Sequence, residues 1–266
     1  MSKIINFWIP LAILVIWLFM AIIGPILPLD PNKVRLQMIL QTPSFEEIFG
    51  YDDLGRSLFD RIVVGSRTSL TVAFAVVCIS VTMGSLIGSV SGFVGGKLDQ
   101  IIVLIIDIFL AFPGILLAIS LAGIMGPGID NVIIALSIVG WVGFARLARV
   151  QVLSLKQREH VQAALALGTS YVRIFTRHLL PLISAPLIIE ASFGIASVII
   201  AEAGLSFLGL GVQPPAASWG SIIRDGAHYL LVAPHMVIVP GLSLACVVVA
   251  VNLLGDHLRD RLDVKN

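Results

Sequence analysis

Residues 158–181 read REHVQAALALGTSYVRIFTRHLLP, a charged, helix-prone insert between two long apolar runs. Steps of three and four predict one continuous helical face, made of Val161, Leu165, Gly168, Val172, Phe175 and Leu179. Gly168 and the two hydroxyl residues after it predict the end of one short helix and the cap of the next, and Pro181 is expected to close the second. The insert therefore predicts short helices at a membrane surface. Either they only tether two spans, or another protein grips their small-residue face.

The runs around the insert are long enough to cross a bilayer. The chain has 266 residues, of which 58% are hydrophobic and 12% charged, whereas soluble domains carry about a quarter charged residues. A membrane helix needs roughly 20 apolar residues, and lipid admits only helices or closed barrels. The sequence thus predicts one all-α membrane domain over residues 1–266, with six spans at about 6–28, 68–95, 100–124, 130–150, 182–206 and 233–255.

Basic residues predict the orientation of these spans. The segment 146–181 carries six Lys or Arg residues against one acid, and short loops rich in Lys and Arg stay in the cytoplasm. Both termini are then expected inside as well, and the connection 29–67 outside. The first run is longer than the apolar core of a signal peptide and lacks a cleavage site, so we expect an uncleaved anchor.

Glycine and acidic residues mark candidate positions inside the spans. Glycines four residues apart would leave a bare strip along span two for close helix packing, within the subunit or against a partner: Gly84, Gly88, Gly92 and Gly96. Acids are costly in lipid and belong in the bundle interior or a cavity. Asp107 and Glu202 are candidates for the pathway or its gate, or are acids satisfied by helix ends or water. For Glu190 the structural alternative is preferred.

Other polar residues point to structure rather than chemistry. Pro113 is expected to bend span three. Asp53, Arg56 and Arg61 in the outer connection either form structural salt bridges or meet an external protein. Cys78 and Cys246 are expected to be small core residues. No catalytic or zinc pattern is present, and Gly96-Lys97 lacks the rest of a phosphate-binding loop. We therefore expect no enzyme and no cofactor on this chain.

The insert and four further stretches resemble a known family. The residues Glu159, Ala163, Ala164, Gly168, Arg173, His178 and Pro181 resemble the E-A-A signature of importer permeases of the ATP-binding-cassette (ABC) class. The chain is similar to the dipeptide/oligopeptide/nickel permease family, as the shorter permease of the pair. The similar stretches are DLGRSLFDRIVVGSRTSL (53–70), DIFLAFPGILLA (107–118), AEAGLSFLGLGVQPPAASWGSII (201–223) and NLLGDHLRDRLD (252–263).

This resemblance implies a type I ABC importer permease fold with a cytoplasmic coupling helix within about residues 157–178. It implies contact with an ATPase through Glu159, Ala163, Ala164, Gly168 and Arg173. The implied partners are a second homologous permease, two cytoplasmic ABC ATPases that bind ATP and Mg, an external solute-binding protein and membrane lipid, with no nucleic acid. The implied location is a bacterial or archaeal cytoplasmic membrane.

The solute implied by the resemblance is a di- or oligopeptide. Nickel, a metal chelate or a glutathione-like molecule would fit the same family. An ion-coupled carrier is a weaker alternative, because such carriers use buried ionisable relays and internal repeats. This sequence offers three scattered acids and no strong repeat.

Overall fold

The computed structural model describes residues 2–263. Within this range the ordered elements are helices, and one isolated β-bridge pairs Tyr51 with Ser57. The all-α class is therefore confirmed. The elements are α1 Ser2–Ile23, the 3₁₀ turn η1 Leu36–Met38, α2 Leu58–Val94, α3 Gly96–Leu110, α4 Gly114–Met125, α5 Ile129–Leu155, α6 Glu159–Ala166, α7 Tyr171–Ile174, the π-helical turn η2 Phe175–Leu179, α8 Leu180–Phe207, α9 Trp219–Ala227 and α10 His235–Asp263.

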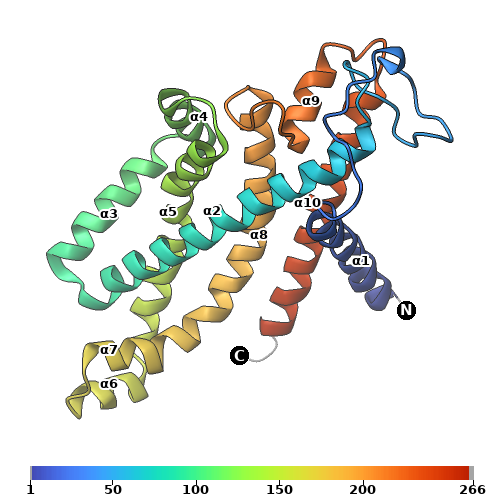
Figure 1. Cartoon of the computed structure of the whole chain (residues 1–266). Coiled ribbons are helices and arrows are strands. Elements are labelled where there is room, and N and C mark those ends of the chain that lie inside the picture. Colours follow the sequence, from blue (N-terminus) through green and yellow to red (C-terminus); the bar gives the residue numbers. More distant parts are fainter. Residues whose placement is uncertain (1, 264–266) are drawn as a thin grey trace.

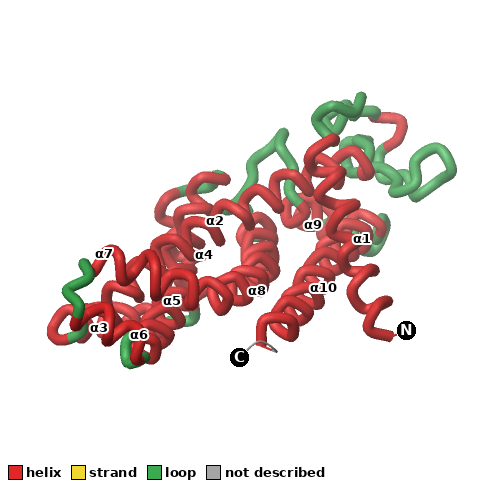
Figure 2. Tube along the Cα trace, turned by 90° about the horizontal axis from the view of Figure 1, so that it is seen from below, coloured by secondary structure: helices red, strands yellow, loops and turns green. Residues whose placement is uncertain are grey.

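Helix α2 organises the bundle. It runs obliquely from the side that carries α9 to the side that carries α6, and α5 and α8 cross behind it (Figure 1). Its most extensive contact is with α5, while α10 packs against α8, α1 and α9. Viewed along the perpendicular direction, α3, α6 and α7 gather at one end of the molecule and α1, α9 and α10 at the other (Figure 2). The insert and the α9 loop thus occupy opposite ends.

Most long helices are apolar enough to span a membrane. Among residues 2–263, four helices pass on length and composition: Leu58–Val94, Ile129–Leu155, Tyr171–Phe207 and His235–Leu262. The pair α3 and α4 passes together, and α1 supplies a shorter apolar stretch, Phe7–Ile23. The criteria give four spans, or five with the bent pair. The count of six stays a prediction.

The third predicted span is broken. Helices α3 and α4 meet at an angle of 86°, and Pro113 is the residue just before α4. Proline lacks the N–H that would continue α3, and it pre-sets the backbone for a helix start. The bend expected from Pro113 is confirmed, and its size turns one span into two short rods.

The start of α2 corrects one predicted boundary. The outer connection was expected to end at residue 67, but the helix begins at Leu58. The Ser57 hydroxyl accepts a hydrogen bond from the Asp60 N–H at 3.2 Å, which caps the helix. The Asp60 carboxylate lies in the first turn of α2, where the positive end of the helix dipole stabilises a negative charge. A Ser-x-x-Asp capping pattern was the signal that could have revealed this start.

The end of the insert corrects a second boundary. Pro181 was expected to close a short helix, but the helical backbone continues from α7 through η2 into α8. Pro181 stands in the first turn of α8, directly after the π-helical turn. A π-helical turn shifts the hydrogen-bond pattern by one residue, and the Leu180 N–H accordingly bonds the Phe175 carbonyl just before the proline. The insert is therefore joined to α8 without a break.

The cysteines correct a third expectation. Cys78 on α2 and Cys246 on α10 are both exposed, so neither belongs to the core. The core instead follows the α2–α5–α8 contacts, with fully buried side chains such as Val76, Ala148 and Ile183. The exposed cysteines face whatever surrounds the helices, lipid or a partner chain.

Candidate functional site

The insert begins where α5 ends. Lys156 is the C-cap residue of α5. Arg158 has an extended backbone (φ −69°, ψ 142°) immediately before α6. Glu159 occupies the first turn of α6, where a carboxylate is favoured by the helix dipole. Gly168 has φ +74°, a conformation that side-chain-bearing residues rarely adopt. Gly168 therefore fixes the tight reversal between α6 and α7.

One face of the insert is packed into the bundle. Val161, Ala164 and Ile174 are buried in a cluster with Val152 of α5 and Ile183 of α8. The buried face of the insert is therefore joined to α5 and α8 through one apolar cluster. This seat corrects one expectation, since Ala164 faces the chain's own core and is only 9% exposed.

The other face of the insert is open. Four of the five expected coupling residues are exposed there: Glu159, Ala163, Gly168 and Arg173. They lie on one accessible projection formed by α6, α7 and the turn between them, called the knob below. Its tip also carries three exposed apolar side chains: Leu167 (85%), Tyr171 (70%) and Val172 (74%). The sequence predicted one continuous helical face that holds both Val161 and Val172, but the reversal at Gly168 separates them, and Val161 is buried whereas Val172 is exposed. An apolar tip with charged flanks suits docking to another protein.

Three of the four strip glycines lie against α5. A Cβ on Gly84 would lie 2.7 Å from the Phe144 Cβ, and one on Gly92 would lie 2.7 Å from the Arg149 carbonyl oxygen. A Cβ on Gly88 would meet the backbone of Ala145. The strip is thus a packing seam inside the subunit. Gly96 is not part of it, because α2 ends at Val94 and Gly96, with φ +60°, begins α3 beside open space.

The acids of the predicted spans do not come together. Asp107 on α3 and Glu190 on α8 are exposed, whereas Glu202 near the end of α8 is 1% exposed. Glu202 accepts hydrogen bonds from the Ser69 hydroxyl of α2 at 2.9 Å and from the Ser206 hydroxyl at 2.7 Å. Glu202 is therefore a buried acid whose two carboxylate oxygens each accept a serine hydroxyl. Its contacts make it a structural link between α2 and α8.

The same link holds α9. The backbone N–H of Trp219 donates to the Ser69 hydroxyl at 3.4 Å, and its indole N–H donates to the Ile62 carbonyl of α2 at 3.2 Å. The Trp219 ring is fully buried and meets Trp17 of α1 edge to face, with centroids 5.2 Å apart. Helix α9 is thus fastened to the first turns of α2. The helix that Trp219 begins was not predicted from the sequence.

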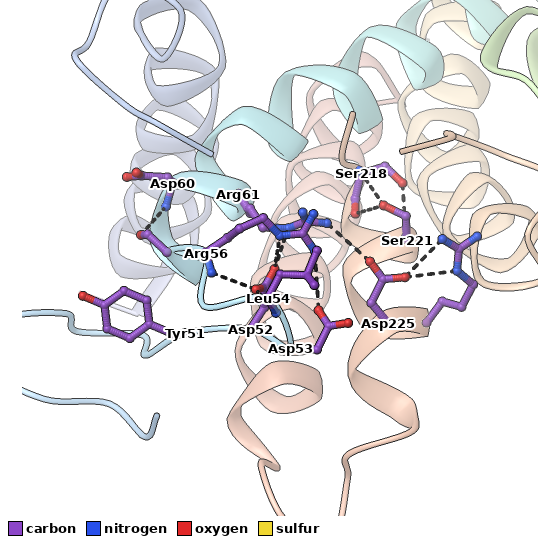
Figure 3. Close-up of polar contacts among 12 residues, drawn as sticks. Tyr51, Asp52, Asp53, Leu54, Arg56, Asp60, Arg61, Ser218, Ser221 and Asp225 are labelled. Carbon is purple, nitrogen blue, oxygen red and sulfur yellow. Dashed lines mark hydrogen bonds and ion pairs between the residues drawn. The ribbon is translucent and has the colours of Figure 1, made fainter. Parts of the chain in front are cut away.

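A buried ion network covers the start of α2 (Figure 3). The Asp52 carboxylate accepts from the backbone N–H groups of Leu54 and Arg56, at 2.9 and 2.8 Å, and from the Arg56 Nε at 2.6 Å. The Arg61 guanidinium lies 3.5 Å from Asp52 and donates to Asp225 of α9 at 3.4 Å. These residues join the outer connection, α2 and α9, which supports the structural alternative for Arg56 and Arg61.

Asp53 has a lesser part in this network than the sequence suggested. Its carboxylate lies 3.5 Å from an Arg56 nitrogen, and its side chain is 26% exposed. Burial raises the pKa of Asp53, and the neighbouring Asp52 carboxylate adds to the shift. The neighbour Asp52, rather than Asp53, is the centre of the network.

Comparisons with known proteins agree with this geometry. The family model described as "Binding-protein-dependent transport system inner membrane component" matches residues 84–265. The dipeptide transport system permease DppC of Alkalihalophilus pseudofirmus is 44% identical over 226 residues, 85% of this chain and 74% of that protein. The nickel permease NikC of Escherichia coli K12 is 39% identical over 89% of this chain and 86% of its own length.

A third relative and a solved structure complete the comparison. The glutathione transport system permease GsiD of Pectobacterium atrosepticum is 40% identical over 90% of this chain and 80% of its own length. A chain of the MetNI methionine ABC transporter, solved in inward-facing conformations, superposes with a TM-score of 0.64 and 19% identity. The superposition covers 76% of this chain and 97% of that one.

Proposed function

Because the chain belongs to the family of binding-protein-dependent transport system inner membrane components and is a permease subunit of an ABC importer, we propose that it forms half of a pathway for di- or oligopeptides. The other half would come from a second, homologous permease. The solute proposal rests on the dipeptide permease DppC, which is 44% identical over 85% of this chain.

Nickel or a nickel chelate is the second candidate, since the nickel permease NikC is 39% identical over 89% of this chain. Uptake assays separate the two solutes. With the importer and its binding protein in proteoliposomes, radiolabelled dipeptide is expected to accumulate on ATP addition, and excess unlabelled tripeptide to compete. Accumulation of ⁶³Ni²⁺ that peptides do not inhibit would overturn the peptide proposal.

The knob formed by α6 and α7 is proposed as the contact with the ATPase. Glu159, Ala163, Gly168 and Arg173 supply its charged and small surfaces, and Leu167 and Val172 its apolar tip. In this arrangement the knob lies in the cytoplasm with both termini, and α9 and the connection before α2 face outside. Closure of two ATPases around bound ATP and Mg would move the knob and tilt the helices anchored to it.

The chain itself is proposed to be a transport subunit that carries no catalytic group. The ion-coupled carrier alternative loses support from the geometry, because Glu202 is occupied by two serine hydroxyls and lies apart from the exposed Asp107 and Glu190. A carrier needs acids that exchange partners along a path. Here the buried acid has fixed partners.

Crosslinking tests the knob with a matched pair of neighbours. We expect Ala163→Cys to crosslink to an ATPase subunit in native membranes, because this position is exposed. Ala164→Cys is the control. It adds the same group one residue away, but it faces the core and is 9% exposed, so its crosslinks should be few.

A functional arm uses Glu159→Lys, which reverses a charge on the exposed first turn of α6. We expect normal membrane insertion, continued ATP hydrolysis and uptake reduced by about tenfold or more, a typical size for lost coupling. Absence of any crosslink from Ala163→Cys, together with wild-type uptake in Glu159→Lys, would refute the docking proposal.

A further inference from the structure

Helix α3 is attached to the bundle at two separate places. Towards its bend, Ile106 is buried against Trp141 and Val142 of α5, and Phe109 packs edge to face on the Trp141 ring. Most of its other side chains are exposed. At the end nearest the insert, α3 is held by polar contacts. The path from α6 to α3 therefore depends on that polar end.

An ion pair fastens this end of α3 to α5. The Arg149 guanidinium binds the Asp99 carboxylate with two parallel hydrogen bonds, Nε to Oδ1 at 2.6 Å and Nη2 to Oδ2 at 2.7 Å. The buried Ser91 hydroxyl of α2 donates to the same Oδ1 at 2.5 Å. Two parallel bonds fix direction as well as distance. Three helices are thus joined at one carboxylate.

A second contact continues this junction into the insert. The Lys156 ammonium donates to the Gly92 carbonyl at the end of α2, at 2.8 Å. The Gln162 side chain of α6 donates to the Lys156 carbonyl at 2.7 Å. Polar contacts therefore run without a gap from α6 to the last turn of α2. The Arg149–Asp99 pair lies two helical turns before Lys156 on α5.

We propose that Arg149, Asp99 and Lys156 are positioning residues that transfer movement of the insert to α2 and α3. This inference rests on the proposed docking of an ATPase to the knob. The packed seat of α6 moves α5 and α8, whereas α3 is connected to that seat through α5 and through the end of α2 that precedes it. When α5 tilts, the two hydrogen bonds of the Arg149–Asp99 pair make α3 move with it. Because α4 follows α3 at the bend, α4 then moves as well.

The test uses the complete importer with its binding protein in proteoliposomes. We expect Arg149→Gln to assemble and to hydrolyse ATP, while solute taken up per ATP hydrolysed falls about fivefold or more, the lower range of typical coupling effects. Asp99 is partly exposed (17%), so water can solvate the carboxylate that loses its partner. Lys97→Gln is the control, since it removes one exposed positive charge from the same turn as Asp99.

A distance measurement separates transfer of movement from simple stabilisation. Spin labels at Gln100 on α3 and His160 on α6, both exposed, are placed in an importer from which Cys78, Cys246 and the partners' cysteines have been removed. In the wild type the distance between the labels is expected to stay nearly constant when ATP is added. In Arg149→Gln it is expected to change, and the swapped pair Asp99→Arg with Arg149→Asp to reduce that change.

The outcomes distinguish this inference from the function on which it rests. Unchanged uptake per ATP and an unchanged distance in Arg149→Gln, with crosslinking from Ala163→Cys intact, would overturn the inference alone. Absence of that crosslink from Ala163→Cys in an importer that keeps Arg149, together with wild-type uptake in Glu159→Lys, would instead overturn the docking proposal. If Arg149→Gln does not assemble, Lys156→Met is measured in the same way, and normal uptake per ATP in that variant counts against the inference.

Discussion

Replacing Gly88 with leucine is expected to leave almost no folded permease in the membrane. Its Cβ would overlap the carbonyl oxygen of Ala145 and lie 2.7 Å from the carbonyl carbon and 2.8 Å from the Cα of that residue. All three atoms are backbone of α5, so no side chain can rotate away. Overpacking a core typically costs about 1–3 kcal/mol and occasionally more. Here the obstacle is the backbone of α5, so we expect a destabilisation at the upper end of this range or beyond it.

The measurement is the yield and melting temperature of the purified importer after size-exclusion chromatography. Gly123→Leu is the control, because Gly123 lies on α4 with no atom within 4 Å of its Cβ position. That variant adds the same side chain to an open surface and should give near-normal yield. A folded Gly88→Leu importer with wild-type melting temperature would mean that α2 and α5 are not packed as described.

Trp219→Ala is expected to destabilise the permease by about 3–5 kcal/mol, the usual cost of removing a fully buried tryptophan. The variant loses the ring contact with Trp17 and the hydrogen bond to the Ile62 carbonyl, and it leaves a cavity between α1, α2 and α9. Because Trp219 attaches α9 to α2, we expect protease to cleave the segment around α9 before the rest of the chain.

Thermal unfolding and limited proteolysis measure these two effects. Trp8→Ala on α1 is the matched control, since that ring is 60% exposed and its removal leaves no internal cavity. We expect the control to melt within about 1–2 °C of the wild type, as exposed substitutions do. Equal melting temperatures for the two variants would show that α9 is not anchored through Trp219.

Much of the fold could be predicted from periodicity and hydropathy alone. The apolar runs located the long helices, Pro113 the break after α3, and Gly168 the reversal in the insert. These signals succeed because they are local: a proline lacks an N–H wherever it stands, and a glycine alone adopts positive φ without strain. The glycine spacing of four likewise indicated a helix seam up to Gly92.

What the sequence missed depends on contacts between distant elements. Nothing near Ala164 indicates that it faces the core, because Ala163 has the same side chain and the difference comes from the angle at which α6 meets α5 and α8. The sequence left the partner of Glu202 open, because Ser69 lies 133 residues away. Pro181 was predicted to end a helix, but the helix continues past it because a π-helical turn precedes it, and the sequence does not reveal that turn.

The uninterrupted helix from Leu58 to Val94 has a thermodynamic consequence. Its first turns hold α9 and its last turn is held by Lys156, so in the proposed importer one helix connects the side that meets the binding protein with the side that meets the ATPase. Coupling between two such ends is reciprocal. The factor by which nucleotide changes the affinity for an external binding protein must then equal the factor by which that protein changes the affinity for nucleotide.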